Sequence, residues 1–304
     1  MVAGARDAAG QRMLPPAARC CRVLPGGTAV RHRQAEDARM TDLAGKVVWV
    51  TGASGGLGEG LALQAALRGA KLVLSARRES ELERVRQRCP RPHEVALLPL
   101  DLERMDDPAE VVRRAGSLLG PVDVLVNNAG LSHRTLALDT SMEICRRIME
   151  VDFFAPVALS RALMPEMLAR GGGHVVVVSS VFGHIAMARR SAYAAAKHAL
   201  HGYFDCARIE LGDKGVRFTL ACPGFVNTQV SVNALRADGQ PFGGLDADIA
   251  SGMPPEVCAD RIWRAVEQDR FEVMVAGKEA VAVYIKRFLP LSWYTAFARR
   301  LKVH

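Results

Sequence analysis

The chain of 304 residues has no hydrophobic run long enough to cross a membrane. No stretch reaches the roughly 18 uncharged apolar residues that a spanning helix requires, although hydrophobic residues make up 49% of the sequence. Internal repeats and a linker able to divide residues 40–304 are also missing. These absences exclude a polytopic membrane protein, a collagen and a low-complexity disordered chain. We therefore expect one globular domain over residues 40–304, cytoplasmic and at most attached to a membrane surface.

The sequence also lacks cysteines at the spacings of a disulfide framework or a metal site. The seven cysteines include no Cys-x-x-Cys pair, and no histidine lies at a metal-ligand spacing from them. An odd, scattered set disfavours a disulfide scaffold and a structural zinc site, and it indicates a reducing compartment. We expect buried packing thiols and no metal ion.

The net charge of +8 is concentrated at the N-terminus. Residues 1–39 contain seven arginines and three acidic residues, so this basic leader carries half of the positive excess. No basic cluster on a structured face is interleaved with aromatics, and nucleic acid is not an expected partner. Without an apolar core segment the leader does not resemble a secretory signal. It fits a transit peptide, a translated segment upstream of a natural start at Met40, or a disordered tail, and the sequence leaves these alternatives open.

From Leu43 onward, short β-branched runs alternate with helical patterns. Each run is almost continuously apolar, as strands buried on both faces of a parallel sheet must be. The alternation predicts an α/β, doubly wound Rossmann-type domain with a seven-stranded parallel sheet flanked by helices. The predicted strands are Val47–Val50, Lys71–Ser75, Val95–Leu98, Val122–Val126, Val175–Ser179, Arg217–Ala221 and Glu272–Val275.

Glycines crowd the turn after the first predicted strand. Gly52, Gly55, Gly56 and Gly58 fall between that strand and a helical pattern that begins with Glu59. Glycines let a backbone turn tightly and approach a pyrophosphate, whose charge meets the free N–H groups at the helix start. Glycine-rich loops also serve ordinary turns, but between a strand and a helix this loop predicts dinucleotide binding.

A tyrosine and a lysine mark a second functional position. Tyr193 and Lys197 are four positions apart on a predicted helix, so they lie on one face about one turn apart. An ammonium beside a phenol favours the phenolate, and such a tyrosine can exchange a proton with an oxygen on a carbonyl carbon. Ser180, at the end of the fifth predicted strand, can hydrogen-bond the same oxygen. An isolated Tyr-x-x-x-Lys would instead be an exposed helix turn.

These motifs together resemble the short-chain dehydrogenase/reductase family. The segment from Asn227 to Leu235 is also similar to the animal group called dehydrogenase/reductase member seven, whose relatives act on steroids, retinoids and other lipophilic carbonyls. The resemblance implies hydride transfer between a nicotinamide and a carbonyl or secondary alcohol carbon of such a substrate. It rests on Thr51-Gly52-x-x-x-Gly56-x-Gly58, Asn127-Asn128-Ala129-Gly130, Ser180, Tyr193-x-x-x-Lys197 and Pro223-Gly224, in the family's order and spacing.

The resemblance also implies a cofactor site. Ala76 cannot accept a hydrogen bond from a ribose 2′-hydroxyl, as an acid does in NAD enzymes. Arg77, helped by Ser54, can pair with a 2′-phosphate, so NADP(H) is the expected cofactor. Alternatively, Arg77 is only a solvated surface charge. Asp101 and Leu102 resemble the family's adenine-binding pair, and the alternative for Asp101 is to cap the following turn. The implied cofactor-binding residues are Gly52, Ser54, Gly56, Leu57, Gly58, Arg77, Asp101, Leu102, Asn128, Ala129, Tyr193, Lys197, Val226 and Thr228.

Asp152 departs from the family's pattern, which has asparagine there. In the family this residue acts largely through its backbone carbonyl, which holds a water of the proton relay. A buried unpaired carboxylate is costly, so we expect Asp152 to pair with Lys197 or to become protonated. The alternative function, an NADP(H)-binding scaffold or redox sensor with little catalysis, rests on this substitution. The implied catalytic set is Asp152, Ser180, Tyr193 and Lys197, and His133, His184 and His198 are expected to be non-catalytic.

Two later segments are expected to shape the substrate site. Residues 228–253, rich in glycine and aspartate, are the expected substrate lid. Residues 280–302 mix apolar, aromatic and basic side chains, which suits a cap over an apolar pocket, a subunit contact or a helix lying on an anionic membrane. The family resemblance implies a homodimer or homotetramer built partly on the helix that carries Tyr193.

Overall fold

A single parallel sheet organises the chain. The computed structural model describes residues 41–230, 232–244 and 247–300, so the expectations for residues 1–39 and 301–302 lie outside the described residues. Seven strands pair in the order β3-β2-β1-β4-β5-β6-β7. Each predicted strand is confirmed to within two residues at either end. The strands are β1 (Val47–Thr51), β2 (Lys71–Ser75), β3 (Val95–Leu97), β4 (Val124–Asn127), β5 (Gly173–Val178), β6 (Val216–Pro223) and β7 (Glu272–Val275).

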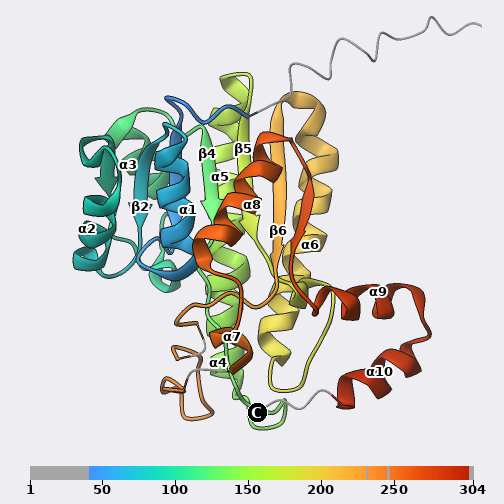
Figure 1. Ribbon diagram of the computed structural model, residues 1–304. Helices are drawn as coiled ribbons and strands as arrows, with labels where there is room; N and C mark the ends of the chain where they lie inside the picture. Colours follow the sequence, from blue (N-terminus) through green and yellow to red (C-terminus); the bar gives the residue numbers. More distant parts are fainter. Residues whose placement is uncertain (1–40, 231, 245–246, 301–304) are drawn as a thin grey trace, which may run out of the picture. The chain divides into compact units, whose positions relative to one another are not determined.

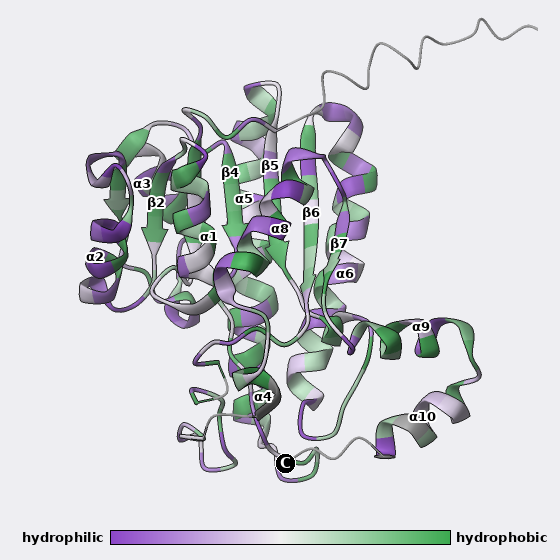
Figure 2. Ribbon diagram, in the orientation of Figure 1, coloured by the Kyte–Doolittle hydropathy of each residue, from purple (hydrophilic) through white to green (hydrophobic). Residues whose placement is uncertain are grey.

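Helices cover both faces of this sheet (Figure 1). Successive strand side chains point to opposite faces, so Val48 packs under α1, α2 and α8 while Trp49 packs under α3, α5 and α6. Figure 2 shows the central strands hydrophobic along most of their length and α2 mostly hydrophilic. The helices are α1 (Gly56–Leu67), α2 (Glu79–Arg88), α3 (Pro108–Leu119), α4 (Met142–Met149), α5 (Ala155–Ala169), α6 (Ser191–Leu211), α7 (Ala247–Ala250), α8 (Pro255–Glu267), α9 (Ala280–Phe288) and α10 (Leu291–Arg300).

The strand order reverses between β1 and β4. In open parallel sheets, ligands bind in the crevice outside the carboxyl ends of the strands at such a reversal. The glycine loop follows β1, Asn128 follows β4, Ser180 follows β5, and Gly224 follows β6. The predicted motifs therefore all lie along the carboxyl edge of the sheet.

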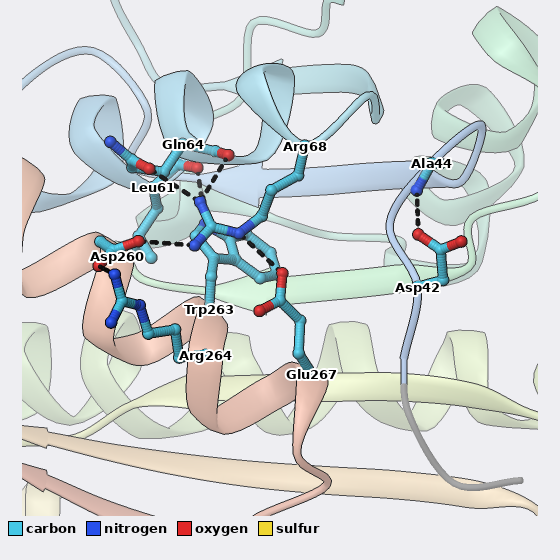
Figure 3. A network of polar contacts seen from close by, with 9 residues as sticks. All are labelled: Asp42, Ala44, Leu61, Gln64, Arg68, Asp260, Trp263, Arg264 and Glu267. Atoms are coloured by element: carbon cyan, nitrogen blue, oxygen red, sulfur yellow. Dashed lines mark hydrogen bonds and ion pairs between the residues drawn. The ribbon is translucent and has the colours of Figure 1, made fainter. Parts of the chain in front are cut away.

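Helices α1 and α8 are joined by polar contacts as well as by apolar packing (Figure 3). The fully buried Trp263 donates its indole hydrogen to the carbonyl of Leu61, at 2.9 Å. Arg68 reaches from the end of α1 to Asp260 at 2.7 Å and to Glu267 at 2.8 Å. This network fixes the helix that begins at the glycine loop against a helix nearly 200 residues further along the chain.

Helices α9 and α10 pack one side against the segment that follows β5. Ala282 and Tyr294 are buried with Val181 and Phe182, and the Tyr294 hydroxyl accepts a hydrogen bond from the Ala186 amide at 2.8 Å. The other side carries exposed apolar side chains, and burial against protein therefore accounts for only part of this segment's composition. Across the described ranges, every helix is too short or too polar to traverse a bilayer. The exposed side chains are Val281, Tyr284, Phe288, Leu289, Leu291 and Trp293.

The expected lid runs from Thr228 after β6 to Met253 before α8. Its Leu235 is buried against α4 and α6 and donates its amide hydrogen to the carbonyl of Ser132 at 2.8 Å. Val226 and Met253 form a bridge that closes the base of the segment. Positions 231 and 245–246 lie outside the described residues. The segment is thus fastened to the rest of the domain at its base and at Leu235.

Candidate active site

Three glycines of the loop are required by their backbone conformation or by the space around them. Gly52 and Gly56 have φ values of +66° and +55°, in the left-handed region that favours glycine. A Cβ on Gly58 would lie 2.1 Å from the Gly52 carbonyl oxygen and 2.4 Å from Asn128 Nδ2. Only glycine fits at position 58 without moving the backbone. Gly55, the cap residue, offers no side-chain acceptor to the first N–H groups of α1, which suits a bound anion.

Asn128 and Thr51 hold this loop against β4. The Asn128 side chain donates a hydrogen bond from Nδ2 to the Thr51 carbonyl at 2.9 Å. The backbone amide of Asn128 donates to the Thr51 hydroxyl at 3.0 Å. The amide of Ala129 reaches the same hydroxyl at 3.2 Å. Hydrogen bonds to Thr51, and one from Asn128 to the Gly52 carbonyl at 3.3 Å, therefore hold the predicted cofactor residues after β4 against the glycine loop after β1.

A small cavity lies where the segment after β6 meets the glycine loop. It has a volume of about 190 Å³. Thr228 closes one side, and its methyl carbon would lie 3.0 Å from a Cβ on Gly56. Val226 is buried two residues earlier. The cavity is lined by Gly56, Glu59, Arg88, Asn227, Thr228, Gln229, Pro255 and Glu256.

Glu59, in the first turn of α1, is a buried acid that the sequence analysis missed as a feature of this site. Arg84 of α2 binds its carboxylate at 2.8 Å, and Arg88 binds the same group. The hydrogen bond from Arg84 lowers the pKa of Glu59, despite burial. Arg84 also donates to the carbonyl of Ser54 at 3.3 Å. These two arginines neutralise an acid beside the expected phosphate position.

Arg77 lies at the end of β2, with an exposed side chain. It makes no hydrogen bond or ion pair with any residue in the described ranges, so its guanidinium is available to a ligand. Asp101 instead accepts a hydrogen bond from the Glu103 amide at 3.1 Å, which is the capping role given above as its alternative. Leu102, the next residue, is buried.

Helix α6 carries the predicted proton-transfer pair. The Lys197 ammonium lies 5.5 Å from the centre of the Tyr193 ring. Phe182 packs edge-on against the same ring, at 5.9 Å between centroids. Ser180 accepts a hydrogen bond from the Phe182 amide at 3.2 Å and donates to the Pro223 carbonyl at 3.4 Å. The three predicted residues thus share one apolar-walled region at the ends of β5 and β6.

Asp152 and Lys197 form a buried ion pair. Pairing with Lys197 was one of the two alternatives expected for Asp152, and protonation was the other. Asp152 lies in a π-helical turn, η4 (Glu150–Phe154), a rare geometry that is frequent at functional sites. Its Oδ2 is 3.3 Å from Lys197 Nζ, and its Oδ1 accepts a hydrogen bond from the Leu131 amide at 2.6 Å. Lys197 also donates to the Val178 carbonyl at 3.1 Å.

Burial and charge act in opposite directions on this pair. Burial raises the pKa of the Asp152 carboxyl, and the Lys197 ammonium and the Leu131 amide offset this only in part. Burial lowers the pKa of Lys197, but the interactions with Asp152 and Tyr193 together outweigh it, so the pKa of Lys197 is raised. The lysine therefore stays charged over the physiological pH range.

The histidines near the site are held by their surroundings. His133 is completely buried, and burial together with Arg190 lowers its pKa to about 4, so it is neutral at physiological pH. Burial also lowers the pKa of His198, whose Nδ1 bonds to the carbonyl of Ala194 at 2.8 Å. That neither histidine acts in catalysis stays a prediction.

Known proteins of similar sequence point to one family. Residues 46–238 match the short chain dehydrogenase family profile. A "Dehydrogenase/reductase SDR family protein 7-like" of Anopheles gambiae is 42% identical over 265 residues, covering 85% of this chain and 84% of the relative. The "Dehydrogenase/reductase SDR family member 7B" of Xenopus laevis is 37% identical over 268 residues, covering 86% and 83%.

Solved structures show the same architecture. A short chain dehydrogenase/reductase from Burkholderia phymatum, in complex with NAD, superposes with a TM-score of 0.73 over 82% of this chain and 95% of its own, at 24% identity. An alcohol dehydrogenase from the archaeon Thermococcus sibiricus, complexed with 5-hydroxy-NADP, gives a TM-score of 0.64 over 75% and 95%, at 25% identity. The chain therefore belongs to the short-chain dehydrogenase/reductase family of oxidoreductases.

Proposed function

We propose that the protein is an NADP(H)-dependent oxidoreductase acting on a carbonyl or secondary alcohol of a lipophilic substrate such as a steroid or retinoid. The observation that carries the proposal is the placement of Tyr193 and Lys197 one turn apart on α6, at the same sheet edge as the glycine loop. Family membership and the likeness to the member 7 relatives support it.

The chain's own residues supply proton transfer and orientation. Tyr193 donates its hydroxyl proton to the carbonyl oxygen during reduction and takes it back during oxidation. Ser180 hydrogen-bonds the same oxygen and stabilises its developing charge. The Lys197 ammonium stabilises the phenolate left on Tyr193. A bound nicotinamide cofactor supplies or accepts the hydride.

The choice of NADP(H) rests on Arg77. The closely packed glycine loop fits a dinucleotide, and the exposed, unengaged Arg77 beside Ala76 fits a 2′-phosphate rather than a free 2′-hydroxyl. One solved neighbour holds NAD and another an NADP derivative, so the fold accommodates both. An Arg77→Gln variant should bind NADPH about 10- to 100-fold more weakly, the value of a charged hydrogen bond. NADH binding by Arg77→Gln should not change. Arg78→Gln is the matched control and should keep the wild-type affinity for NADPH. A preference of the wild-type protein for NADH would refute the assignment.

An apolar wall beside Tyr193 supports a lipophilic substrate. Phe182 and Ile185 from the segment after β5 pack there with Ala282 and Tyr294 of α9 and α10. Oxidation of NADPH should be followed with ketosteroids, retinal, small aliphatic ketones and polar aldehydes. We expect turnover of the bulky apolar carbonyls and little of the polar ones. Turnover confined to small polar carbonyls would contradict the substrate class.

A scaffold or redox sensor is the second candidate. The observation that favours it is that Asp152 engages the Lys197 ammonium in a buried ion pair. This candidate predicts tight NADPH binding without turnover of any carbonyl in the panel. Measurable turnover of one substrate would eliminate it.

We also propose that the exposed side of α9 and α10 lies on an anionic membrane surface. Phe288 is 73% and Trp293 65% exposed, and the exposed Arg287 lies beside Phe288 in the last turn of α9. Phe288→Glu and Trp293→Glu should reduce co-sedimentation with phosphatidylserine vesicles. The control Leu67→Glu, an equally exposed leucine on α1, should leave it unchanged. Equal vesicle binding by all variants would remove the membrane contact.

The expected homo-oligomer is a further proposal. Ile209 on α6 is 75% exposed, and Phe154 just before α5 is 50% exposed, which gives two large apolar side chains for a subunit contact. Light scattering of the purified protein should give a dimer or tetramer mass, and Ile209→Glu should lower it. A monomer at micromolar concentration would refute the proposal.

A further inference from the structure

Four side chains with metal-binding atoms meet beside the predicted active site. His184 follows the turn η5 (Val181–Gly183), His201 lies on α6, Cys222 on β6 and Glu272 at the start of β7. One ligand atom from each lies within 4.8 Å of the others. We propose that these four residues bind a zinc ion.

The separations between the ligand atoms suit a tetrahedral ion. Cys222 Sγ is 3.6 Å from His184 Nε2, which is 3.5 Å from Glu272 Oε1. His201 Nδ1 is 3.5 Å from Glu272 Oε2. With Zn–S of about 2.3 Å and Zn–N or Zn–O of about 2.0–2.1 Å, tetrahedral coordination separates ligand atoms by about 3.3–3.6 Å. These three pairs already have this spacing, but Glu272 faces His184 with Oε1 and His201 with Oε2, so its carboxylate would turn to place one oxygen on the ion or would bind through both.

The surroundings of His201 match those of a ligating histidine. Its Nε2 lies 2.9 Å from the Ser179 hydroxyl, so binding through Nδ1 leaves an Nε2–H group that donates to this serine. Such an outer hydrogen bond fixes the ring of most metal-bound histidines. A Cβ on Gly183 would lie 2.4 Å from the same Nε2, so glycine at that position lets the ring approach. The backbone therefore accommodates the ring in this orientation.

The donor set and its burial select the metal. Two imidazoles, a thiol and a carboxylate combine nitrogen, sulfur and oxygen, which zinc accepts, whereas magnesium and calcium need oxygen ligands. Cys222 is fully buried, whereas the Glu272 side chain is 38% exposed, so the cluster reaches solvent at Glu272 and shields the sulfur. Four protein ligands describe a closed, structural site.

The position of the site defines what the ion would do. His201 follows Lys197 by one turn of α6, and Cys222 precedes Pro223, whose carbonyl accepts the hydrogen bond from Ser180. A bound ion would fasten α6 to β6 and β7 directly behind the predicted catalytic residues. Without an ion, the same four groups serve only as a hydrogen-bonded ion-pair network. The two possibilities differ in metal content.

The test measures zinc in the full-length protein, reconstituted with one equivalent of Zn²⁺ after chelation and then dialysed. We expect one zinc per chain in the wild type and in the control Cys258→Ser, which removes a buried thiol on α8. Cys222→Ser and His184→Gln should bind zinc at least about 10-fold more weakly, since even outer-shell changes cost that much. Co²⁺ in place of zinc should give a thiolate-to-metal charge-transfer band that Cys222→Ser lacks.

Glu272→Gln keeps the test decisive if a buried variant fails to fold. Glu272 is partly exposed, so its replacement leaves the core intact, and it should weaken zinc binding and lower the zinc-induced rise in melting temperature. Zinc content that is zero in the wild type, or equal in the wild type and all ligand variants, would overturn the proposal.

Discussion

Replacing Asp152 by asparagine probes the buried ion pair behind Tyr193. Asp152 is completely buried, and its Oδ2 lies 3.3 Å from Lys197 Nζ. At an effective dielectric constant of about 20, unit charges at this distance attract by about 5 kcal/mol. Removing each ion from water costs several kcal/mol, so attraction and desolvation nearly balance. Each charge is tolerated because the other is present.

Asparagine keeps the size of the side chain and can still accept the hydrogen bond from Leu131, but it removes the negative charge. The pKa of Lys197 should then fall, because burial lowers it and the Asp152 carboxylate raises it. We expect the alkaline decline of kcat/KM to begin at lower pH than in the wild type. Near neutral pH, the Lys197 ammonium would no longer be paired with Asp152 and would stabilise negative charge at the reacting oxygen more strongly. We expect kcat to rise by up to about tenfold, since each 1.36 kcal/mol of added transition-state stabilisation gives that factor.

The assay measures kcat/KM for NADPH-dependent carbonyl reduction between pH 6 and pH 10, with thermal unfolding of each variant as a control. Asp152→Ala is the contrasting variant, because it removes the whole polar group, so that the buried Leu131 amide and the Lys197 charge both lose their partner, and it should cost about 3–5 kcal/mol of stability. An Asp152→Asn profile that superimposes on the wild-type profile would refute a role for this charge.

Three further changes test the cofactor loop and its support. Gly58→Ala should abolish NADPH binding because its Cβ would lie 2.1 Å from a backbone oxygen, whereas Gly202→Ala on α6, with nothing within 4 Å, should add about 0.5–1 kcal/mol of stability. Equal NADPH affinity in both would contradict the packing argument. Trp263→Phe should destabilise the protein by at least about 2 kcal/mol in urea unfolding, because the Leu61 carbonyl loses its indole partner and a cavity opens. An unchanged midpoint would show that this contact is dispensable. Because the folded pKa of Glu59 is lowered from 4.5, the stability that this carboxylate contributes is present above pH 4.5 and is lost as the pH falls through the folded pKa. The stability difference between the wild type and Glu59→Gln should therefore shrink as the pH falls below 4.5 and through the folded pKa, and a difference independent of pH would contradict the ion pairing.

The fold could be predicted because its signals are local. Strands buried on both faces of the sheet must be continuously apolar, and each such run from Val47 to Val275 became a strand. The glycine loop was equally readable, since Gly52 and Gly56 adopt positive φ and Gly58 has no room for a side chain. Steric requirements of this kind leave a direct trace in the residue type.

Other features depend on how helices dock, which the sequence does not display. Glu59 meets Arg84 across two helices, 25 positions apart, and nothing near either residue marks the contact. His184 and Glu272 are 88 positions apart, so no spacing rule for metal ligands brings them together. Asp152 lies between these cases, since the sequence left open whether it pairs with Lys197 or becomes protonated, and the structure shows the contact with Lys197 at 3.3 Å.

Tyr193→Phe provides the most direct test of the proposed chemistry, with turnover and NADPH affinity measured on the same preparation. Phenylalanine keeps the ring that packs on Phe182 but removes the hydroxyl that exchanges the proton. We expect kcat to fall by at least about 100-fold, the usual contribution of general acid–base catalysis, while the Kd for NADPH changes little. Turnover by Tyr193→Phe at the wild-type rate would contradict the assignment of Tyr193 as the general acid and base.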